Sequence, residues 1–364
     1  MSPIWILAQT YPSPDQQYQQ SYIHTRLLFY KSQGLECAVL SFSARVSYEY
    51  EGISIFSLGD FEALSIQKID LLISHAPNMR NHIRFMVRYQ KQIQEMIWFI
   101  HGHEVLIKHH YYPKPYAFQS QSHLIRRVLN GVYDHLKVRI LKWLIQSWFK
   151  HLHLVFVSRW MQDAYFECVG TERQATLRRA SIIANAIHPV FLEQRYQPNS
   201  LFKADFVTIR LLDLSKYAID IVVALARANP LLTFDVYGEG DYFKHHQKPD
   251  NLRHFPYFMT PQDIPSVLDQ YRCALMPTRL DAQGVMMCEM ASYGIPVITS
   301  DLPICQEMLA GFENSYFIDN QDGSQPLGSI LESIHFLGGD PRERFSEAET
   351  VQKEIDLIRG FEKD

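Results

Sequence analysis

Short apolar runs alternate with longer segments of helical spacing along the whole chain. In the first half these runs lie at residues 5–9, 37–42, 69–74, 96–100, 154–158 and 181–184. Each run has the length of a strand, and the stretches between them are long enough for helices. Parallel strands need such crossovers because a tight turn cannot join them. The alternation therefore predicts parallel β-sheets covered by helices.

The pattern is interrupted once and then restarts. Residues 192–205 lose hydrophobic periodicity and are typical of a connector, after which the runs resume at 206–210, 233–237, 273–276 and 296–299. A chain of 364 residues is long enough for two domains with separate cores. We predict an α/β fold of two Rossmann-like, doubly wound domains that face a cleft. The first spans residues 1–192 and the second residues 193–345, and 346–364 form a helix that caps the second domain or crosses back to the first.

Charge and cysteine spacing exclude several classes of protein. The 35 basic and 39 acidic residues leave a net charge of −4, which provides no general field for a nucleic acid. The 5 cysteines lack the paired spacing of zinc sites, so reduced, buried thiols are expected. No apolar run reaches the about 18 residues of a membrane span, and residues 4–8 are too short for a signal peptide. We expect a cytoplasmic protein, either free or peripheral on the inner face of the plasma membrane.

The segment 276–309 carries the most chemical information, and it reads MPTRLDAQGVMMCEMASYGIPVITSDLPICQEML. The segment starts where a strand ends. It continues as a loop that contains Gly284, and a helix begins near Val285. The unpaired N–H groups at the start of such a helix bind phosphate oxygens. Asp281 and Glu289 lie before the helix and in its second turn. Both are thus expected near the carboxyl edge of the sheet, where open α/β sheets bind ligands.

This segment closely resembles the signature of the retaining glycosyltransferases of family 4, which have the GT-B fold of two Rossmann-like domains. In this signature an acidic residue is separated from a Glu by seven residues. A Gly lies three positions after the acidic residue, and a Gly-x-Pro-Val run follows the Glu. The matching residues are Asp281, Gly284, Glu289, Gly294, Pro296 and Val297. The alternative interpretation is a chance loop, helix and strand with a surface Glu.

The resemblance implies a hexosyltransferase that moves a sugar, with retention at the anomeric carbon, from a UDP- or GDP-sugar to a hydroxyl of a glycan or lipid-linked acceptor. It implies that the enzyme needs no cofactor and no metal. It also implies that the enzyme acts in the synthesis of a bacterial surface polysaccharide. The donor would bind the second domain and the acceptor the first. Two alternatives remain open, namely a nucleotide-sugar epimerase or hydrolase of the same fold and a catalytically silent binding subunit. The second is motivated by residues 11–20, which carry glutamines where the family often has two glycines.

The resemblance also assigns roles to single residues. Arg210 and Lys216 would bind the diphosphate, Glu289 the ribose and Asp281 the hydroxyls of the donor sugar. His101, in the run WFIHGHE, would hydrogen-bond near the sugar and joins Arg210, Lys216 and Asp281 in the catalytic set. The donor-binding residues are Arg210, Lys216, Gly238, Gly240, Asp281, Gly284, Val285 and Glu289.

Each of these residues also has a structural interpretation. Arg210 and Lys216 could be solvated surface charges, His101 a hydrogen-bonded residue at a strand end, and Gly238 to Gly240 an ordinary tight turn. Asn185 resembles a residue at the family's domain junction and is interpreted as structural.

A basic and aromatic region spans residues 123–160. It holds seven cations and one acid, a local net charge of +6, with Trp143, Leu144, Trp148 and Phe149 interleaved. The cations are Arg126, Arg127, Lys137, Arg139, Lys142, Lys150 and Arg159, and the acid is Asp134. Such residues on amphipathic helices are typical of a surface that contacts anionic lipid. The alternative is a pair of core helices whose polar sides are basic.

Overall fold

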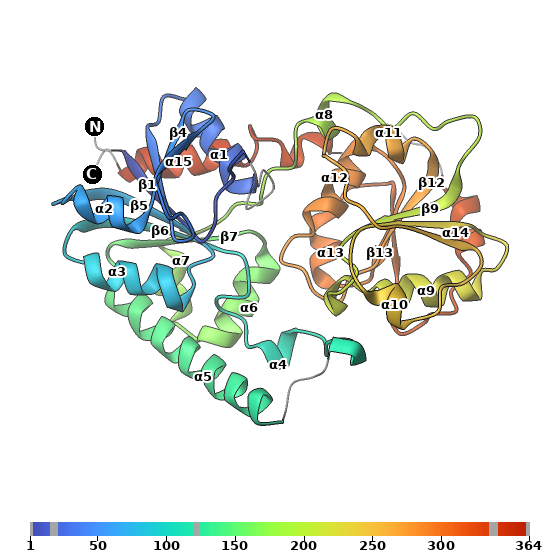
Figure 1. Cartoon of the computed structure of the whole chain (residues 1–364), viewed down its shortest axis with the longest axis horizontal. Helices are drawn as coiled ribbons and strands as arrows, with labels where there is room; N and C mark the ends of the chain where they lie inside the picture. The colour runs from blue at the N-terminus through green and yellow to red at the C-terminus, as the bar shows by residue number, and fades with distance from the viewer. Residues whose placement is uncertain (1–2, 15–20, 120–123, 335–340, 362–364) are drawn as a thin grey trace. The chain divides into compact units, whose positions relative to one another are not determined.

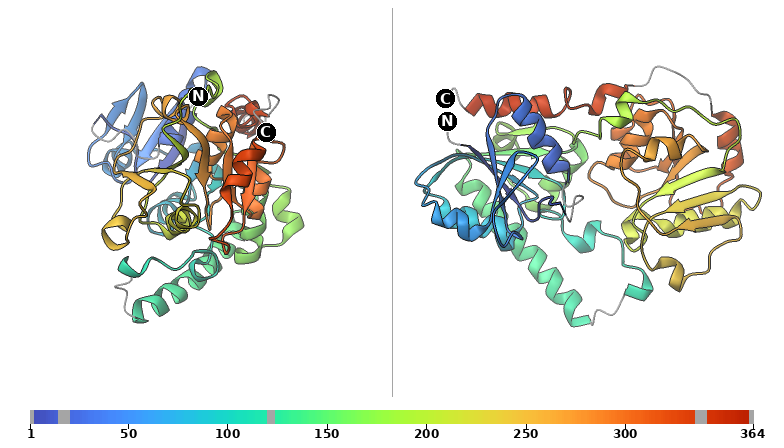
Figure 2. Two further views of the ribbon diagram at one scale, coloured as in Figure 1. Left: turned by 90° about the vertical axis from the view of Figure 1, so that its right-hand side faces the viewer. Right: turned by 45° about the horizontal axis from the view of Figure 1, so that its top comes forward.

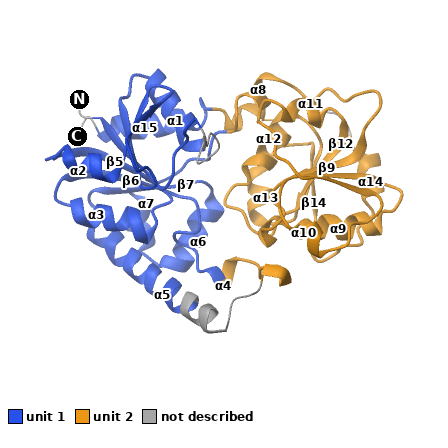
Figure 3. Ribbon diagram, viewed as in Figure 1, with its two compact units in different colours: residues 1–108, 129–186, 347–364 blue, residues 109–128, 187–346 orange. Residues whose placement is uncertain are grey.

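The computed structural model of the chain describes residues 3–14, 21–119, 124–334 and 341–361 (Figure 1). The chain divides into two compact units (Figure 3). The first unit combines residues 1–108, 129–186 and 347–364, and the second combines 109–128 and 187–346. Each unit is built around a sheet of its own.

The sheet of the first unit runs in the order β3-β4-β2-β1-β5-β6-β7-β8. Its strands are β1 (Ile4–Ala8), β2 (Cys37–Ser41), β3 (Tyr48–Tyr50), β4 (Ile53–Phe56), β5 (Ile69–His75), β6 (Ile93–Ile100), β7 (Leu152–Phe156) and β8 (Ala180–Ile182). All pair in parallel except β3 with β4. The strand order reverses between β1 and β5, which is the switch point of a doubly wound sheet.

Helices cover both faces of this sheet (Figures 1 and 2). Ile4 and Ile6 of β1 face a core shared with α1 (Ser21–Ser32) and α15 (Val351–Phe361). Their neighbour Trp5 faces the other way, against Phe61 of α2 (Leu58–Ala63). On that same face lie α3 (Arg84–Tyr89), α5 (Leu124–Ser147) and α6 (Arg159–Val169).

The C-terminal helix α15 belongs to the first unit and is joined to α1 by a buried ion pair. Glu354 accepts hydrogen bonds from Arg26 Nε at 2.9 Å and from the Tyr30 hydroxyl at 2.6 Å. Arg26 also donates to Asn185 Oδ1 at 2.7 Å, so this predicted structural residue anchors α1. The sequence left open where this helix packs, and the structure places it against α1.

The sheet of the second unit runs in the order β11-β10-β9-β12-β13-β14, and its neighbouring strands pair in parallel. Its strands are β9 (Ala204–Ile209), β10 (Phe234–Tyr237), β11 (Leu252–Phe255), β12 (Tyr271–Met276), β13 (Val297–Ser300) and β14 (Ser315–Ile318). One face packs on α9 (Ile219–Ala228) and α14 (Leu327–Ser333), and the other carries α11 (Ile264–Leu268), α12 (Val285–Tyr293) and α13 (Pro303–Met308). This is the predicted second Rossmann-like domain.

Residues 109–128 are grouped with the second unit, whereas the sequence analysis placed them in the first domain. Aromatic side chains explain this position. The Tyr116 hydroxyl donates to Asp220 Oδ1 of α9 at 2.8 Å, and Phe118 stacks on His245 with ring centroids 4.5 Å apart. His245 ends the short helix α10 (Tyr242–His245).

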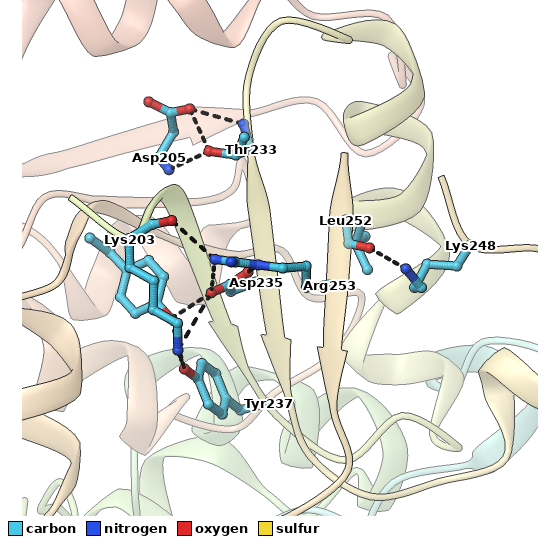
Figure 4. A network of polar contacts seen from close by, with 9 residues as sticks. Lys203, Asp205, Thr233, Asp235, Tyr237, Lys248, Leu252 and Arg253 are labelled. Carbon is cyan, nitrogen blue, oxygen red and sulfur yellow. Dashed lines mark hydrogen bonds and ion pairs between the residues drawn. The ribbon is translucent and has the colours of Figure 1, made fainter. Parts of the chain in front are cut away.

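A buried carboxylate joins side chains from three strands of the second sheet (Figure 4). Asp235 on β10 receives hydrogen bonds from Arg253 Nε of β11 at 2.7 Å and from the Tyr271 hydroxyl of β12 at 2.7 Å. Lys203 Nζ lies 3.9 Å from the same carboxylate. Burial, together with the bonds to Tyr237 and Asp235, raises the pKa of Tyr271.

Candidate functional site

A cavity of about 330 Å³ opens in the second unit at the carboxyl ends of β9 and β12. The strand order reverses between these two strands, so the cavity lies at the switch point, where open α/β sheets bind ligands. Of the predicted residues, Arg210, Asp281, Gly284 and Val285 line this cavity. Tyr217, Met276, Thr278 and Gln283 complete much of its wall, and none of them was predicted as a site residue.

Arg210 follows β9 and is held by neutral groups. Its NH1 donates to the backbone carbonyls of Tyr217 and Pro277, and its NH2 lies 3.4 Å from Met276 Sδ. Its Nε is buried without a partner, and no carboxylate forms an ion pair with it among the described residues. Burial lowers the pKa of Arg210 to about 10. The guanidinium stays charged at neutral pH, so the site contains a cation that an anionic ligand would stabilise.

The loop after β12 is fixed by a second arginine. Arg279 makes a two-point ion pair with Asp220, at 2.7 Å to Oδ1 and 2.6 Å to Oδ2. Its backbone N–H donates to the carbonyl of Lys216 at 2.7 Å. The loop after β12 and the segment after β9 therefore hold each other in place around Arg210.

The start of α12 forms another part of the cavity wall. Asp281 Oδ1 accepts from the backbone N–H of Ala282 at 2.8 Å and of Gln283 at 3.3 Å. Gly284 precedes the helix with φ 73°, a left-handed conformation that favours glycine. Because Gly284 and Val285 both line the cavity, the unpaired amides of the first helical turn are available to a ligand anion.

Two predicted residues, Lys216 and Glu289, do not line the cavity. Glu289, in the second turn of α12, is buried and accepts from the backbone N–H of His188 at 3.2 Å. Burial raises the pKa of Glu289 to about 7, and the hydrogen bond from the His188 backbone has a smaller, opposite effect. Lys216 Nζ lies 4.6 Å from the centroid of the Tyr217 ring, which is part of the cavity wall.

The two predicted glycines after β10 have a packing role in the structure. Gly238 has φ 140°, and a Cβ on it would lie 1.8 Å from the carbonyl oxygen of Arg210. Gly240 has φ 143°, and its added Cβ would lie 2.9 Å from Asp213 Oδ1. Neither lines the cavity. They let the loop after β10 lie directly on the segment that carries Arg210.

His101 belongs to the first unit, at the end of β6. Its Nε2 lies 3.4 Å from His75 Nδ1, and its ring is 5.3 Å from that of Tyr22. Its backbone N–H donates to Glu104 Oε1. Burial, with a smaller effect of Arg26, lowers the pKa of His101 to about 3. The ring is therefore neutral at physiological pH and suited to hydrogen bonding rather than to carrying a charge.

Only some side chains of the basic region 123–160 are exposed to solvent. Lys137 is buried, pairs with Asp134 at 3.1 Å and donates to the carbonyl of Leu106 at 2.9 Å, so this cation is not part of an exposed basic surface. Leu144 and Trp148 are buried as well. The side chains of Arg126 and Arg127 lie outside the described residues, as do residues 15–20 of the glutamine-rich loop.

The described residues contain no cluster of three or more His, Cys, Asp or Glu side chains that could hold a metal ion. Within the same part of the chain, no helix is long and apolar enough to cross a membrane.

Residues 210–334 match the family model described as Glycosyl transferases group 1. The fold is shared with a sucrose-phosphate synthase from Thermosynechococcus elongatus, at 13% identity over 99% of each chain and a TM-score of 0.70. A glycosyltransferase from Rickettsia africae aligns over 100% of both chains at 11% identity and a TM-score of 0.66. HepE from Anabaena, solved with UDP-glucose, aligns over 99% of this chain and 98% of its own at 13% identity and a TM-score of 0.61. No curated protein sequence matches the chain.

Proposed function

We propose that the chain transfers a sugar from a UDP- or GDP-sugar to a hydroxyl of a glycan or lipid-linked acceptor. The proposal is supported by the match of residues 210–334 to the family model and by the fold. The reaction would belong to the synthesis of a bacterial surface polysaccharide. The observation that carries this proposal is Arg210, a charged guanidinium whose NH1 donates to backbone carbonyls and whose Nε has no partner, although Asp281 lines the same cavity. A nucleoside diphosphate would supply acceptor oxygens that carry negative charge.

The leaving diphosphate would be stabilised by the protein's own cations and amides. Arg210 and the first amides of α12 bind its oxygens, and Lys216 adds a second cation from the adjoining segment. We propose that these groups take the place of a metal ion. Glu289 would bind the ribose hydroxyls and Asp281 those of the donor sugar, with carboxylate oxygens as acceptors.

Retention at the anomeric carbon is part of the proposal. In it, no side chain forms a covalent intermediate, and an oxygen of the leaving phosphate takes the proton of the acceptor hydroxyl. His101 would hydrogen-bond to the donor sugar as a neutral ring, which fits its lowered pKa. A neutral imidazole can donate one hydrogen bond and accept one, as the hydroxyls of a sugar require.

The test is a transfer assay with UDP- and GDP-sugars, run with and without a bacterial lipid extract as acceptor. We expect a glycosylated product only with acceptor, and a loss of transfer of about tenfold or more in Lys216→Ala and in Glu289→Ala. Free sugar or an epimer formed without acceptor would instead support a hydrolase or epimerase. Binding of donor without turnover would support a silent subunit, and unchanged transfer by both variants would refute the assigned roles.

We also propose that the exposed face of α5 contacts an anionic membrane surface. Val132, Leu136 and Trp143 are 62%, 55% and 65% exposed and recur at helical spacing. Arg139 lies on the same face and Lys142 beside it. Large apolar side chains among cations suit the boundary between lipid headgroups and acyl chains.

Vesicle co-sedimentation tests this contact with the full-length chain. We expect binding to vesicles that contain phosphatidylglycerol, and about tenfold weaker binding for the Leu136→Ser, Trp143→Ser double variant. Leu231→Ser is the matched control, because Leu231 is 95% exposed on the second unit. Equal binding of all three proteins would refute the proposed surface.

A further inference from the structure

The first unit contains a separate cavity of about 190 Å³ between α2 and α3. Phe42, which follows β2, forms one side, and α3 with the turn before it forms the other. The lining includes Phe42, Arg80, Asn81, Arg84, Phe85 and Tyr89. Because Phe42 directly follows a strand and the turn follows β5, the cavity lies near the carboxyl edge of the first sheet.

Two arginines of this cavity have no counter-charge. Arg80 and Arg84 lie four residues apart, so they project from the same side of their helix. No ion pair or hydrogen bond of either side chain exists among the described residues. Their mutual repulsion would be relieved by an anion bound between them.

The carboxylates of the neighbouring helix α2 are already engaged. Glu62 forms an ion pair with Arg88 at 2.8 Å, which neutralises the third arginine of the cavity wall. Asp60 accepts hydrogen bonds from the hydroxyls of Ser47 at 2.5 Å and Ser57 at 2.7 Å. Arg80 and Arg84, both exposed to solvent, therefore have no carboxylate partner among the described residues and can bind the anion of a ligand.

The backbone around Arg80 is held in an unusual conformation. Ala76 has φ 50°, a left-handed conformation that is rare for a non-glycine residue, and residues Met79–Ile83 form a π-helical turn. Asn78 and Asn81 both donate side-chain hydrogen bonds to Gln9 Oε1, at 3.1 and 2.8 Å. These bonds tie the turn to the end of β1, at the switch point of the sheet. Strained backbone and π-helical turns of this kind occur preferentially at functional sites.

We infer that this cavity binds an anionic group, a phosphate or a carboxylate, of the acceptor substrate. Arg80 and Arg84 would hold the anion by charge-assisted hydrogen bonds, with Asn81 as a further donor. Phe42, Phe85 and Tyr89 offer apolar surface to the rest of the ligand. The assignment of the ligand as acceptor depends on the proposed function, in which the second unit holds the donor.

Three sugars that differ only at C6 test this inference, namely glucose 6-phosphate, glucuronate and glucose, with binding measured by calorimetry on the full-length chain. We expect the charged sugars to bind at least about tenfold more tightly than glucose. The affinities of glucose 6-phosphate and glucuronate, compared with each other, show whether the cavity prefers a phosphate or a carboxylate. The Arg80→Gln, Arg84→Gln double variant should lose the preference for charge.

Arg178→Gln is the control, because it removes an exposed cation directly after α7 (Arg173–Leu177), a helix that adjoins the edge strand β8. Its preference for charged sugars should match that of the unmodified chain. Absence of any preference in the unmodified chain, or a preference that survives in the double variant, would overturn the inference. UDP-glucose binding, measured on the same samples, reports separately on the donor site, so a failure there would count against the proposed function and not against this cavity.

Discussion

Glu289 is a residue of the candidate site whose ionisation depends strongly on the fold. It is 8% exposed, and burial raises its pKa from 4.5 to about 7. Between these two pH values the folded chain binds a proton that the unfolded chain has released. The stability that this proton provides is complete below pH 4.5 and is lost as the pH rises to about 7.

We therefore expect the unliganded chain to lose about 3 kcal/mol of unfolding free energy, relative to Glu289→Gln, when the pH rises from 4.5 to 7.5. Urea unfolding of both proteins at several pH values measures this difference. Glu193→Gln, which alters an exposed carboxylate of α8 (Val190–Glu193), serves as control. A constant difference between Glu289→Gln and the unmodified chain over this range would contradict the raised pKa.

Single residues of the site differ in how far the sequence identifies them. Asp281 was predicted because it stands at a fixed offset in a local pattern, and Arg210 because an Arg and a Lys follow a strand as in the family that the chain resembles. Both line the cavity. Arg279 and Asp220, which fix the loop around them, are 59 residues apart and belong to no such pattern. Their pairing depends on how β9 and β12 are placed side by side, which only the folded sheet shows.

At the scale of elements, the glycine-bounded helix α12 was predicted over its full length, Val285–Tyr293. Gly284 and Gly294, both with positive φ, mark its two ends. The strands β3, β4, β11 and β14 were not predicted. They lie at or next to sheet edges, where partial exposure removes the continuous apolar pattern that identifies a buried strand.

The contact between the loops after β9 and β10 gives a prediction at this scale. Gly238→Ala would place a Cβ 1.8 Å from the Arg210 carbonyl, in a conformation that L-residues rarely adopt. We expect a loss of about 2–3 kcal/mol in unfolding free energy and weaker UDP-glucose binding, because Arg210 must move.

Gly360→Ala is the matched control for this variant. Gly360 lies in α15 with no atom within 4 Å of an added Cβ, so we expect unchanged or slightly higher stability. Thermal unfolding and calorimetric titration with UDP-glucose measure both effects. Normal donor binding by Gly238→Ala would show that the two loops do not position Arg210.

At the scale of the whole molecule, each unit has its own core and a buried carboxylate that pairs with an arginine. Glu354 joins α15 to α1 in the first unit, and Asp235 joins neighbouring strands in the second. Replacing either carboxylate by an amide removes the negative charge and one of the two oxygens that accept from the arginine and tyrosine groups. Two variants can therefore report on the two units separately.

We expect Glu354→Gln to destabilise the first unit by about 3 kcal/mol, and Asp235→Asn the second by about 2 kcal/mol, since Arg253 is partly exposed to solvent. Scanning calorimetry should show that each variant lowers the midpoint temperature of one unfolding transition. UDP-glucose should raise the midpoint temperature of only the transition that Asp235→Asn affects. A ligand shift of the transition lowered by Glu354→Gln would contradict donor binding by the second unit.

The return of α15 to the first unit has a consequence for biosynthesis. Residues 1–186 leave the ribosome before the helix that covers one face of their sheet has been translated. Throughout the synthesis of the second unit, Arg26 and Tyr30 on the nascent chain lack the carboxylate that they bind in the finished protein. The second unit, whose residues all precede α15, can thus complete its core first, and the N-terminal unit is the last to mature.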